Sequence, residues 1–196
     1  MSVTEILGFV TGAVCVVLVI RRSIWNWPAG LANNGFYLVL FAQFGLYADA
    51  GLQIVYLALG AYGWWAWLRG GPHRSALLIQ RTTRQQAVIF AGATLIGAVA
   101  MALLLSRLTN STVPWADGLT TALSLVAQWM LTRKLLENWW VWIVADVLYV
   151  GLYIYKELYL TAVLYAVFLV LCVLGLRAWR RVFIADPDHK PELAVA

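Results

Sequence analysis

Charged residues are scarce in this chain. Only 12% of its 196 residues are Asp, Glu, Lys or Arg, about half the share in a typical soluble domain, whereas 63% are hydrophobic. This composition excludes an ordinary water-soluble domain and indicates a chain whose main solvent is lipid. A helix that spans a bilayer takes roughly 20 residues. The length therefore allows at most about seven or eight spans and leaves no room for a sizeable soluble domain.

Side chains that commonly bind metals or perform catalysis are also few. The two cysteines, Cys15 and Cys172, lie inside apolar runs, and the two histidines, His73 and His189, lie far apart in polar segments. We therefore expect no disulfide, no metal site and no cofactor. No nucleotide-binding Walker loop is present, so ATP does not drive the protein directly. No nucleophile–base pair stands out in the apolar runs, which argues against an integral membrane enzyme.

Seven apolar segments can be read along the chain. They cover residues 3–20, 27–44, 51–67, 87–105, 119–131, 139–155 and 160–179. The second and fifth are the most polar, because they contain Asn33, Asn34, Ser124 and Gln128. The pattern predicts an all-α integral membrane protein with seven transmembrane helices.

The net charge of +5 is concentrated in short connections between the apolar segments. One set of connections holds twelve of the 14 basic residues: Arg21, Arg22, Arg69, Arg74, Arg81, Arg84, Arg133, Lys134, Arg177, Arg180, Arg181 and Lys190. Only Arg107 and Lys156 fall on the other side. By the positive-inside rule the N-terminus lies outside and the C-terminus in the cytoplasm of an inner-membrane protein. The basic clusters thus set topology, and we expect no nucleic-acid partner.

The chain matches itself without gaps at an offset of 112 residues. Identical residues recur at Arg21 and Arg133, Asn26-Trp27 and Asn138-Trp139, Tyr37 and Tyr149, Gly63 and Gly175, and Ala66-Trp67 and Ala178-Trp179. The first three spans therefore repeat as the last three, and the fourth span restores the direction of the chain. The prediction is a 3+1+3 parallel tandem repeat, one of the known transporter designs, with a substrate site near the bilayer midplane between the repeats.

This repeat divides the chain into four parts. Residues 1–70 form the first three-helix repeat, and 71–112 a cytoplasmic loop with the linker helix. Residues 113–182 form the second repeat, and 183–196 a polar, disordered cytoplasmic tail.

Polar side chains inside a bilayer are costly and usually line a cavity or pair with one another. Those predicted near the middle of spans are Asn33, Asn34, Gln53, Gln128 and Asp146. Asp146 is the only ionisable residue among them, which makes it the strongest candidate for a functional site. Two alternatives stand beside this hypothesis: a protonated, structural Asp146, and amides that merely hydrogen-bond neighbouring helices together.

The sixth span carries the sharpest pattern. Trp139, Trp142, Asp146 and Tyr149 are spaced i, i+3, i+7 and i+10, so they share one face of a helix. Indole rings stack on flat rings and attract cations, and a carboxylate favours a nearby positive charge. The face suits a flat aromatic ligand, preferably a cationic one, although Trp139 could instead be an interfacial anchor. The first repeat has Gly30 and Asn34 where the second has Trp142 and Asp146.

Several longer stretches carry a further signal: residues 27–33 (Trp-Pro-Ala-Gly-Leu-Ala-Asn), 47–53, 62–67 (Tyr-Gly-Trp-Trp-Ala-Trp), 132–139 and 175–179 (Gly-Leu-Arg-Ala-Trp). Together they resemble the PnuC family of bacterial vitamin transporters. The resemblance extends over nearly the whole chain to about residue 181, and it implies an architecture like that of SWEET-type transporters.

The resemblance implies passage of a vitamin or vitamin precursor down its gradient, followed by cytoplasmic phosphorylation that traps it. The family's Trp-x-x-Trp pair at the substrate matches Trp139 and Trp142. The family's downstream Asn is replaced here by Asp146, which favours the cationic rings of nicotinamide riboside and thiamine over neutral riboflavin. Our hypothesis is a nicotinamide riboside facilitator, with thiamine and then riboflavin as alternatives, and a membrane sensor or assembly protein as the alternative of another class.

The expected substrate-binding residues combine the sixth-span face with polar residues of other spans. They are Trp139, Trp142, Asp146, Tyr149, Gln53, Asn33 and Gln128. The resemblance also implies a homo-oligomer, a trimer, in the lipid bilayer.

Overall fold

The computed structural model describes residues 3–43, 45, 47–108 and 112–185, and these are helical almost throughout. The helices are α1 (Val3–Ile20), α2 (Asn26–Gln43), α3 (Tyr47–Arg69), α4 (Arg84–Leu108), α5 (Pro114–Thr132), α6 (Asn138–Tyr155), α7 (Tyr159–Ala185) and the short 3-10 helix η1 (Pro72–Arg74). The predicted all-α class with seven long helices is confirmed. The predicted tail, except for the last turn of α7, lies outside the described residues.

Several helices are longer than the apolar runs that predicted them. α5 begins at Pro114 rather than at residue 119, and α7 continues to Ala185 rather than ending at 179. The hydropathy falls at the first polar side chains, but the helical hydrogen bonding of the backbone continues past these residues. Pro114 suits the first helical turn, because its missing N–H would have no partner there.

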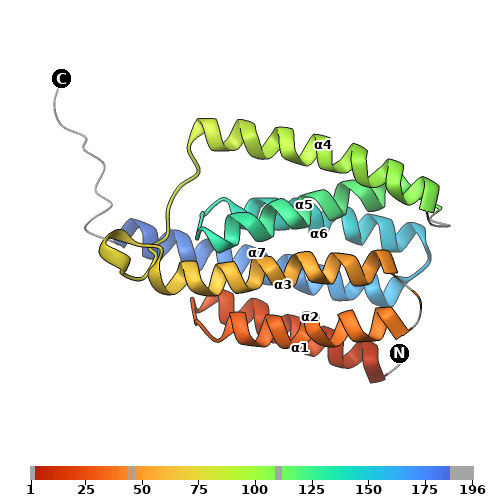
Figure 1. Cartoon of the computed structure of the whole chain (residues 1–196), viewed down its shortest axis with the longest axis horizontal. Coiled ribbons are helices and arrows are strands. Elements are labelled where there is room, and N and C mark those ends of the chain that lie inside the picture. The colour runs from red at the N-terminus through yellow and green to blue at the C-terminus, as the bar shows by residue number, and fades with distance from the viewer. Residues whose placement is uncertain (1–2, 44, 46, 109–111, 186–196) are drawn as a thin grey trace.

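The contacts between six of the helices close into a ring. The remaining long helix, α4, lies at one edge of the bundle, outside this ring (Figure 1). Around the ring, α1 packs on α2, α2 on α3, α3 on α5, α5 on α6, α6 on α7, and α7 on α1. α4 packs on the outer side of α5 alone. The helices α2 and α6 are therefore on opposite sides of the ring, with two helices between them in either direction.

The contact of α4 with α5 depends on small side chains. A Cβ at Gly118 of α5 would lie 2.7 Å from the backbone nitrogen of Ala102 and 2.8 Å from the carbonyl oxygen of Ala98, both on α4. Small residues at such positions let two helix backbones approach closely, which is how helices associate in lipid. The side of α4 that faces away from α5 exposes Ile89, Ile96 and Leu103.

Two described helices are long and apolar enough to cross a bilayer by length and composition. They are α4 over Arg84–Arg107 and α7 over Tyr159–Ala185, each with a mean hydropathy of 2.5. The ring helices α2, α3, α5 and α6 contain the predicted polar residues, which lowers their hydropathy.

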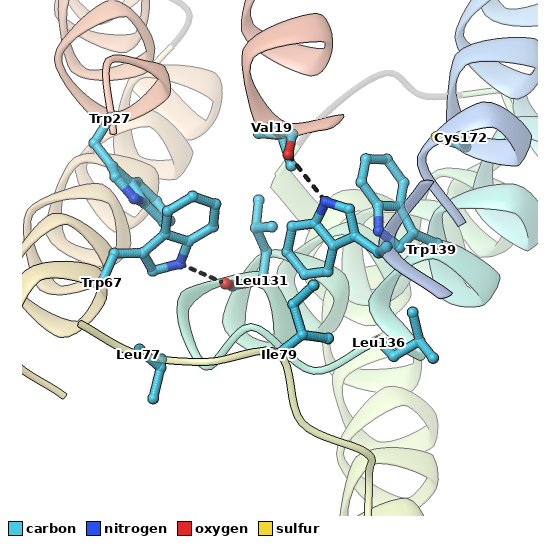
Figure 2. Close-up of a cluster of buried hydrophobic side chains, with 10 residues drawn as sticks. Val19, Trp27, Trp67, Leu77, Ile79, Leu131, Leu136, Trp139 and Cys172 are labelled. Carbon is cyan, nitrogen blue, oxygen red and sulfur yellow. Dashed lines mark hydrogen bonds between the residues drawn. The ribbon is translucent and has the colours of Figure 1, made fainter. Parts of the chain in front are cut away.

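One end of the ring is filled by four buried tryptophans, Trp27, Trp67, Trp139 and Trp179, and we call it the tryptophan end (Figure 2). Trp27 meets Trp67 edge-on with ring centroids 5.3 Å apart, and Trp139 meets Trp179 edge-on at 5.5 Å. Together with Val19, Leu131 and their neighbours, these rings close this end of the bundle with apolar side chains.

Hydrogen bonds at this end are reciprocal between the two halves of the chain. The indole nitrogen of Trp67 donates to the carbonyl of Leu131 at 3.0 Å, and that of Trp179 donates to the carbonyl of Val19 at 3.0 Å (Figure 2). Each donor and each acceptor is 112 residues from its counterpart. The same offset relates Arg22 to Lys134, both with positive φ, and Gly63 to Gly175, which pack against Trp27 and Trp139 respectively.

The segment that joins α3 to α4, residues 70–83, crosses the tryptophan end, and we call it the strap. Its Leu77 and Ile79 are buried in the same apolar cluster (Figure 2). Gln80 pairs with the loop between α5 and α6 through two backbone hydrogen bonds, from its nitrogen to the Lys134 carbonyl at 3.0 Å and from the Leu136 nitrogen to its carbonyl at 2.8 Å. The strap therefore covers the tryptophans and ties the first half of the chain to the second.

Candidate functional site

A cavity of about 400 Å³ lies inside the ring of six helices. Every ring helix contributes to its wall, and α4 does not. The residues that the argument uses are Gly12, Gly30, Asn33, Asn34, Gln53, Tyr56, Gln128, Trp139, Trp142, Asp146, Tyr165 and Cys172. The volume falls in the range of roughly 300–1,000 Å³ that is usual for small-molecule sites.

Six of the seven predicted site residues line this cavity. Asn33 comes from α2, Gln53 from α3, Gln128 from α5, and Trp139, Trp142 and Asp146 from α6. The predicted face of α6 thus points into the ring, and four helices bring their polar residues to one space. The seventh, Tyr149, is not among the lining residues.

Tyr149 instead belongs to a group of stacked tyrosines beside the cavity. Its ring lies 4.5 Å from that of Tyr165, centroid to centroid, and 6.0 Å from that of Tyr153. Tyr165 does line the cavity. Tyr149 therefore supports a wall of the cavity through a neighbouring ring.

Asp146 is the only acidic residue in the cavity lining and is 4% exposed. The thiol of Cys172 on α7 lies 3.4 Å from its Oδ2 and donates to it. The described lining contains no Lys, Arg or His. A buried carboxylate with no basic neighbour attracts a cationic ligand and disfavours an anionic one.

The two tryptophans of the predicted pair occupy different surroundings. Trp139 is 2% exposed and packs into the cluster at the tryptophan end, so it forms the floor of the cavity. Trp142 is only partly buried and lies one turn higher on α6, between Trp139 and Asp146. Trp142 is therefore better placed than Trp139 to offer a ring face to a ligand.

Other polar lining groups already have protein partners. The side-chain amide nitrogen of Asn33 donates to the hydroxyl of Thr11, and the hydroxyl of Tyr56 is 2.7 Å from that of Ser124. The first bond joins α2 to α1 and the second joins α3 to α5. These groups combine both roles that the sequence left open, since they hold helices together and also face the cavity.

Sequence reasoning missed several lining residues, among them Tyr56, Tyr165, Cys172 and Gly30. Aromatic and small residues in an apolar run look the same whether they face lipid or a cavity. The 112-residue offset offered a signal for two of them, because it maps Gln53 onto Tyr165 and Trp142 onto Gly30.

Three buried polar atoms at the floor of the cavity have no hydrogen-bond partner among the described residues. They are Nε1 of Trp27, Nε1 of Trp139 and Oδ1 of Asn138, and all three residues line the cavity. Each such group costs roughly 1–3 kcal/mol when it is kept from water. The closed floor is therefore well packed but incompletely hydrogen-bonded.

Comparison with known proteins identifies the family. The family model described as nicotinamide mononucleotide transporter matches residues 2–181. The chain belongs to this family. The predicted resemblance is confirmed, and membership identifies the chain as a membrane transport protein.

Relatives within the family carry different names. The riboflavin/roseoflavin transporter RibM of Streptomyces davaonensis is 29% identical over 90% of this chain and 84% of its own length. The nicotinamide riboside transporter PnuC of Escherichia coli is 26% identical over 91% of this chain and 85% of its own.

A solved structure shares the fold. The crystal structure of the vitamin B3 transporter PnuC superposes with a TM-score of 0.66 and 28% identity, over 89% of this chain and 79% of that chain. The family likeness therefore covers the helical bundle and the cavity inside it.

Proposed function

We propose that this protein imports nicotinamide riboside by facilitated diffusion. One observation carries the proposal: the central cavity of a transporter-family chain combines the partly buried ring of Trp142 with the buried carboxylate of Asp146. The pyridinium ring of nicotinamide riboside is flat and positively charged. It can stack on an indole and lie near a carboxylate at the same time.

The wall chemistry favours the nucleoside over its phosphate ester. A mononucleotide carries a phosphate group, which proteins usually bind with Arg, Lys or clustered backbone N–H groups. The described cavity lining has no basic side chain and has one acid. Phosphorylation in the cytoplasm then traps the imported nucleoside, because the product no longer suits this cavity. The protein itself acts as a carrier and not as an enzyme.

The chain follows a 3+1+3 plan, with α1–α3 and α5–α7 as parallel repeats and α4 as the linker. The reciprocal bonds of Trp67 and Trp179 across the two halves support this plan. So does the position of α4 outside the ring. Transport proceeds by rocking of the two triples about the cavity.

The tryptophan end faces the cytoplasm, the N-terminus lies outside, and the C-terminus lies inside. The asymmetric placement of basic residues supports this orientation. Copies of the chain assemble as trimers in the inner membrane, as the family resemblance implies.

Riboflavin is the second candidate, because a relative named for riboflavin transport is about as similar to this chain as the nicotinamide riboside transporters are. Riboflavin is a flat neutral ring system, so it would stack on Trp142 but gain less from Asp146. Thiamine is cationic, so both the indole of Trp142 and the carboxylate of Asp146 would favour its binding.

Calorimetric titration of the detergent-purified protein with the three vitamins tests the proposal. We expect nicotinamide riboside to bind most tightly, and Trp142→Ala and Asp146→Ala each to weaken binding by more than about 1 kcal/mol, the scale of a lost stacking or charge contact. Asp146→Asn separates charge from shape. It should weaken nicotinamide riboside binding and leave any riboflavin binding nearly unchanged.

Trp140→Ala is the matched control, because Trp140 lies on the same helix but is 57% exposed and outside the cavity lining. Binding of thiamine alone would overturn the substrate and keep the transporter assignment. Binding of none of the three vitamins would favour a sensor or assembly protein.

A further inference from the structure

Gly30 marks a gap in the wall of the cavity that the mechanism above does not use. It lies on α2, lines the cavity, and corresponds at the 112-residue offset to Trp142 on α6. The second repeat thus places an indole where the first repeat places no side chain at all. Since α2 and α6 are on opposite sides of the ring, the two positions lie on opposite walls.

The space beside Gly30 is open. A Cβ built at this position would have no atom within 4 Å apart from its own chain neighbours and helix backbone. The glycine is therefore not required by close helix packing, in contrast to Gly63 and Gly175, which press against the rings of Trp27 and Trp139. Glycine is also a poor helix former, so it weakens α2 without a compensating packing contact there.

The next turn of α2 is polar where it faces the same space. Asn33 and Asn34 follow Gly30 by three and four residues, so they lie on the same side of the helix, and both line the cavity. Their amides can accept and donate hydrogen bonds, which suits hydroxyl groups. The α2 wall is thus open and polar, and the α6 wall carries an indole and a carboxylate.

We propose that Gly30, with Asn33 and Asn34, forms the subsite for the polyhydroxylated part of the ligand, the ribose of a nucleoside or the ribityl chain of a flavin. This rests on the proposed function and adds a position that determines specificity. The aromatic ring lies on the α6 side against Trp142, and the sugar extends toward the α2 backbone. The missing side chain at residue 30 provides the room that the sugar needs.

Replacing Gly30 tests this assignment. Nicotinamide riboside and riboflavin are titrated into the purified wild type, Gly30→Ala and Gly30→Leu by calorimetry. One added methyl group should weaken binding roughly tenfold, and Leu should weaken it by roughly a hundredfold or more, as misfit groups in a binding pocket do. Both variants should keep the elution volume of the wild type and melt at the same temperature or a higher one, because the added atoms enter open space and replace a poor helix former.

Gly35→Leu is the matched control. Gly35 lies on the same helix, also has no atom within 4 Å of a built Cβ, and is not part of the cavity lining. We expect its binding constant to stay within about twofold of the wild type, since it adds the same side chain away from the pocket. Unchanged binding in Gly30→Leu, with binding lost in Trp142→Ala, would overturn the Gly30 subsite and leave the proposed function standing.

A sugarless ligand separates the two walls. The cation 1-methylnicotinamide, titrated at millimolar concentration, should bind wild type and Gly30→Leu within about twofold of each other. If Gly30→Leu lost as much affinity for this cation as for the nucleoside, the ring and not the sugar would lie at Gly30, and the assignment would be overturned. A wild type that binds thiamine alone would also overturn it, and one that binds no vitamin would overturn both proposals.

Discussion

At the scale of single residues, Lys134 is a cation in an unusual place. It follows α5 at the tryptophan end, where its Nζ donates to the carbonyl of Leu77 at 2.7 Å and lies 4.4 Å from the ring centroid of Trp67. Burial and, as a smaller contribution, the charge of Arg22 together lower the pKa of Lys134 from 10.5 to about 8. The folded protein therefore holds a proton on this amine less firmly than the unfolded chain does.

The stability of the protein should rise with pH across this titration. Between about pH 8 and pH 10.5 the unfolded chain binds more protons at Lys134 than the folded protein, so raising the pH favours folding. Melting temperatures of wild type and Lys134→Arg in detergent measure the effect, because Arg stays charged throughout this range. We expect the melting temperature of the wild type to rise relative to that of the variant as the pH increases. A constant difference would show that Lys134 does not titrate there.

Gly175 and Gly63 show how a missing side chain can be required by packing. A Cβ at Gly175 would overlap the outer ring atoms of Trp139, and a Cβ at Gly63 would overlap those of Trp27. The rings belong to a tightly filled cluster and have little room to move.

Gly175→Ala should therefore destabilise the protein by about 1–3 kcal/mol, the usual cost of overpacking a core. Gly151→Ala is the comparison, because a Cβ at Gly151 meets nothing within 4 Å. Thermal unfolding of both variants in detergent checks the prediction, which is wrong if the two variants have the same melting temperature.

At the scale of elements, one carboxylate adds to the backbone pairing of Gln80 and the burial of Leu77 and Ile79 in holding the strap on the bundle. Oε2 of Glu137 accepts hydrogen bonds from the backbone nitrogen of Thr82 at 2.7 Å and from its hydroxyl at 2.9 Å. Oε1 pairs with Nε of Arg81 at 3.2 Å, but the Arg81 side chain is 70% exposed. Exposed ion pairs add little stability, whereas hydrogen bonds to a charged acceptor add more.

Glu137→Ala should thus cost about 1–3 kcal/mol through the lost bonds to Thr82. Arg81→Ala should cost less than about 1 kcal/mol. Melting temperatures of the two variants separate these contributions. If Arg81→Ala lowered the melting temperature as much as Glu137→Ala, the stabilisation by Glu137 would come from the ion pair instead.

Sequence alone predicted the helices well because each apolar run is long and bounded by basic or turn residues. It could not predict the strap. Residues 70–83 are irregular and mostly polar, and the burial of Leu77 and Ile79 among them depends on pairing with the loop near Leu135, far away along the chain. Local patterns carry no information about such long-range contacts.

The cavity was partly predictable for a related reason. Asn, Gln and Asp are conspicuous in an apolar run, so the polar lining could be expected. Gly30 and Cys172 are ordinary in such a run, and only the closed ring of helices shows that they face inward.

At the scale of the whole molecule, the proposed rocking of the two triples opens the tryptophan end. The two indole nitrogens and the amide oxygen that lack partners there would gain water when the floor of the cavity parts. Opening breaks apolar packing but relieves these unsatisfied groups, so the two states can lie close in free energy.

The proposed orientation gives a direct test. A green fluorescent protein fused after residue 185 should fluoresce, because it folds in the cytoplasm, and alkaline phosphatase inserted after Leu108 should be active outside, beyond the C-terminal end of α4. The opposite pair of results would invert the membrane topology.

The reciprocal indole bonds have a consequence for how such a bundle can be divided. A unit of three helices carries both a donor, Trp67 or Trp179, and an acceptor, Val19 or Leu131. Two copies of one unit could therefore join by making the same bond twice, as in an isologous dimer. In the proposed 3+1+3 plan the two units belong to one chain, so the two walls of the cavity can differ, with the indole of Trp142 on one side and Gly30 on the other. Two identical subunits could not differ in this way.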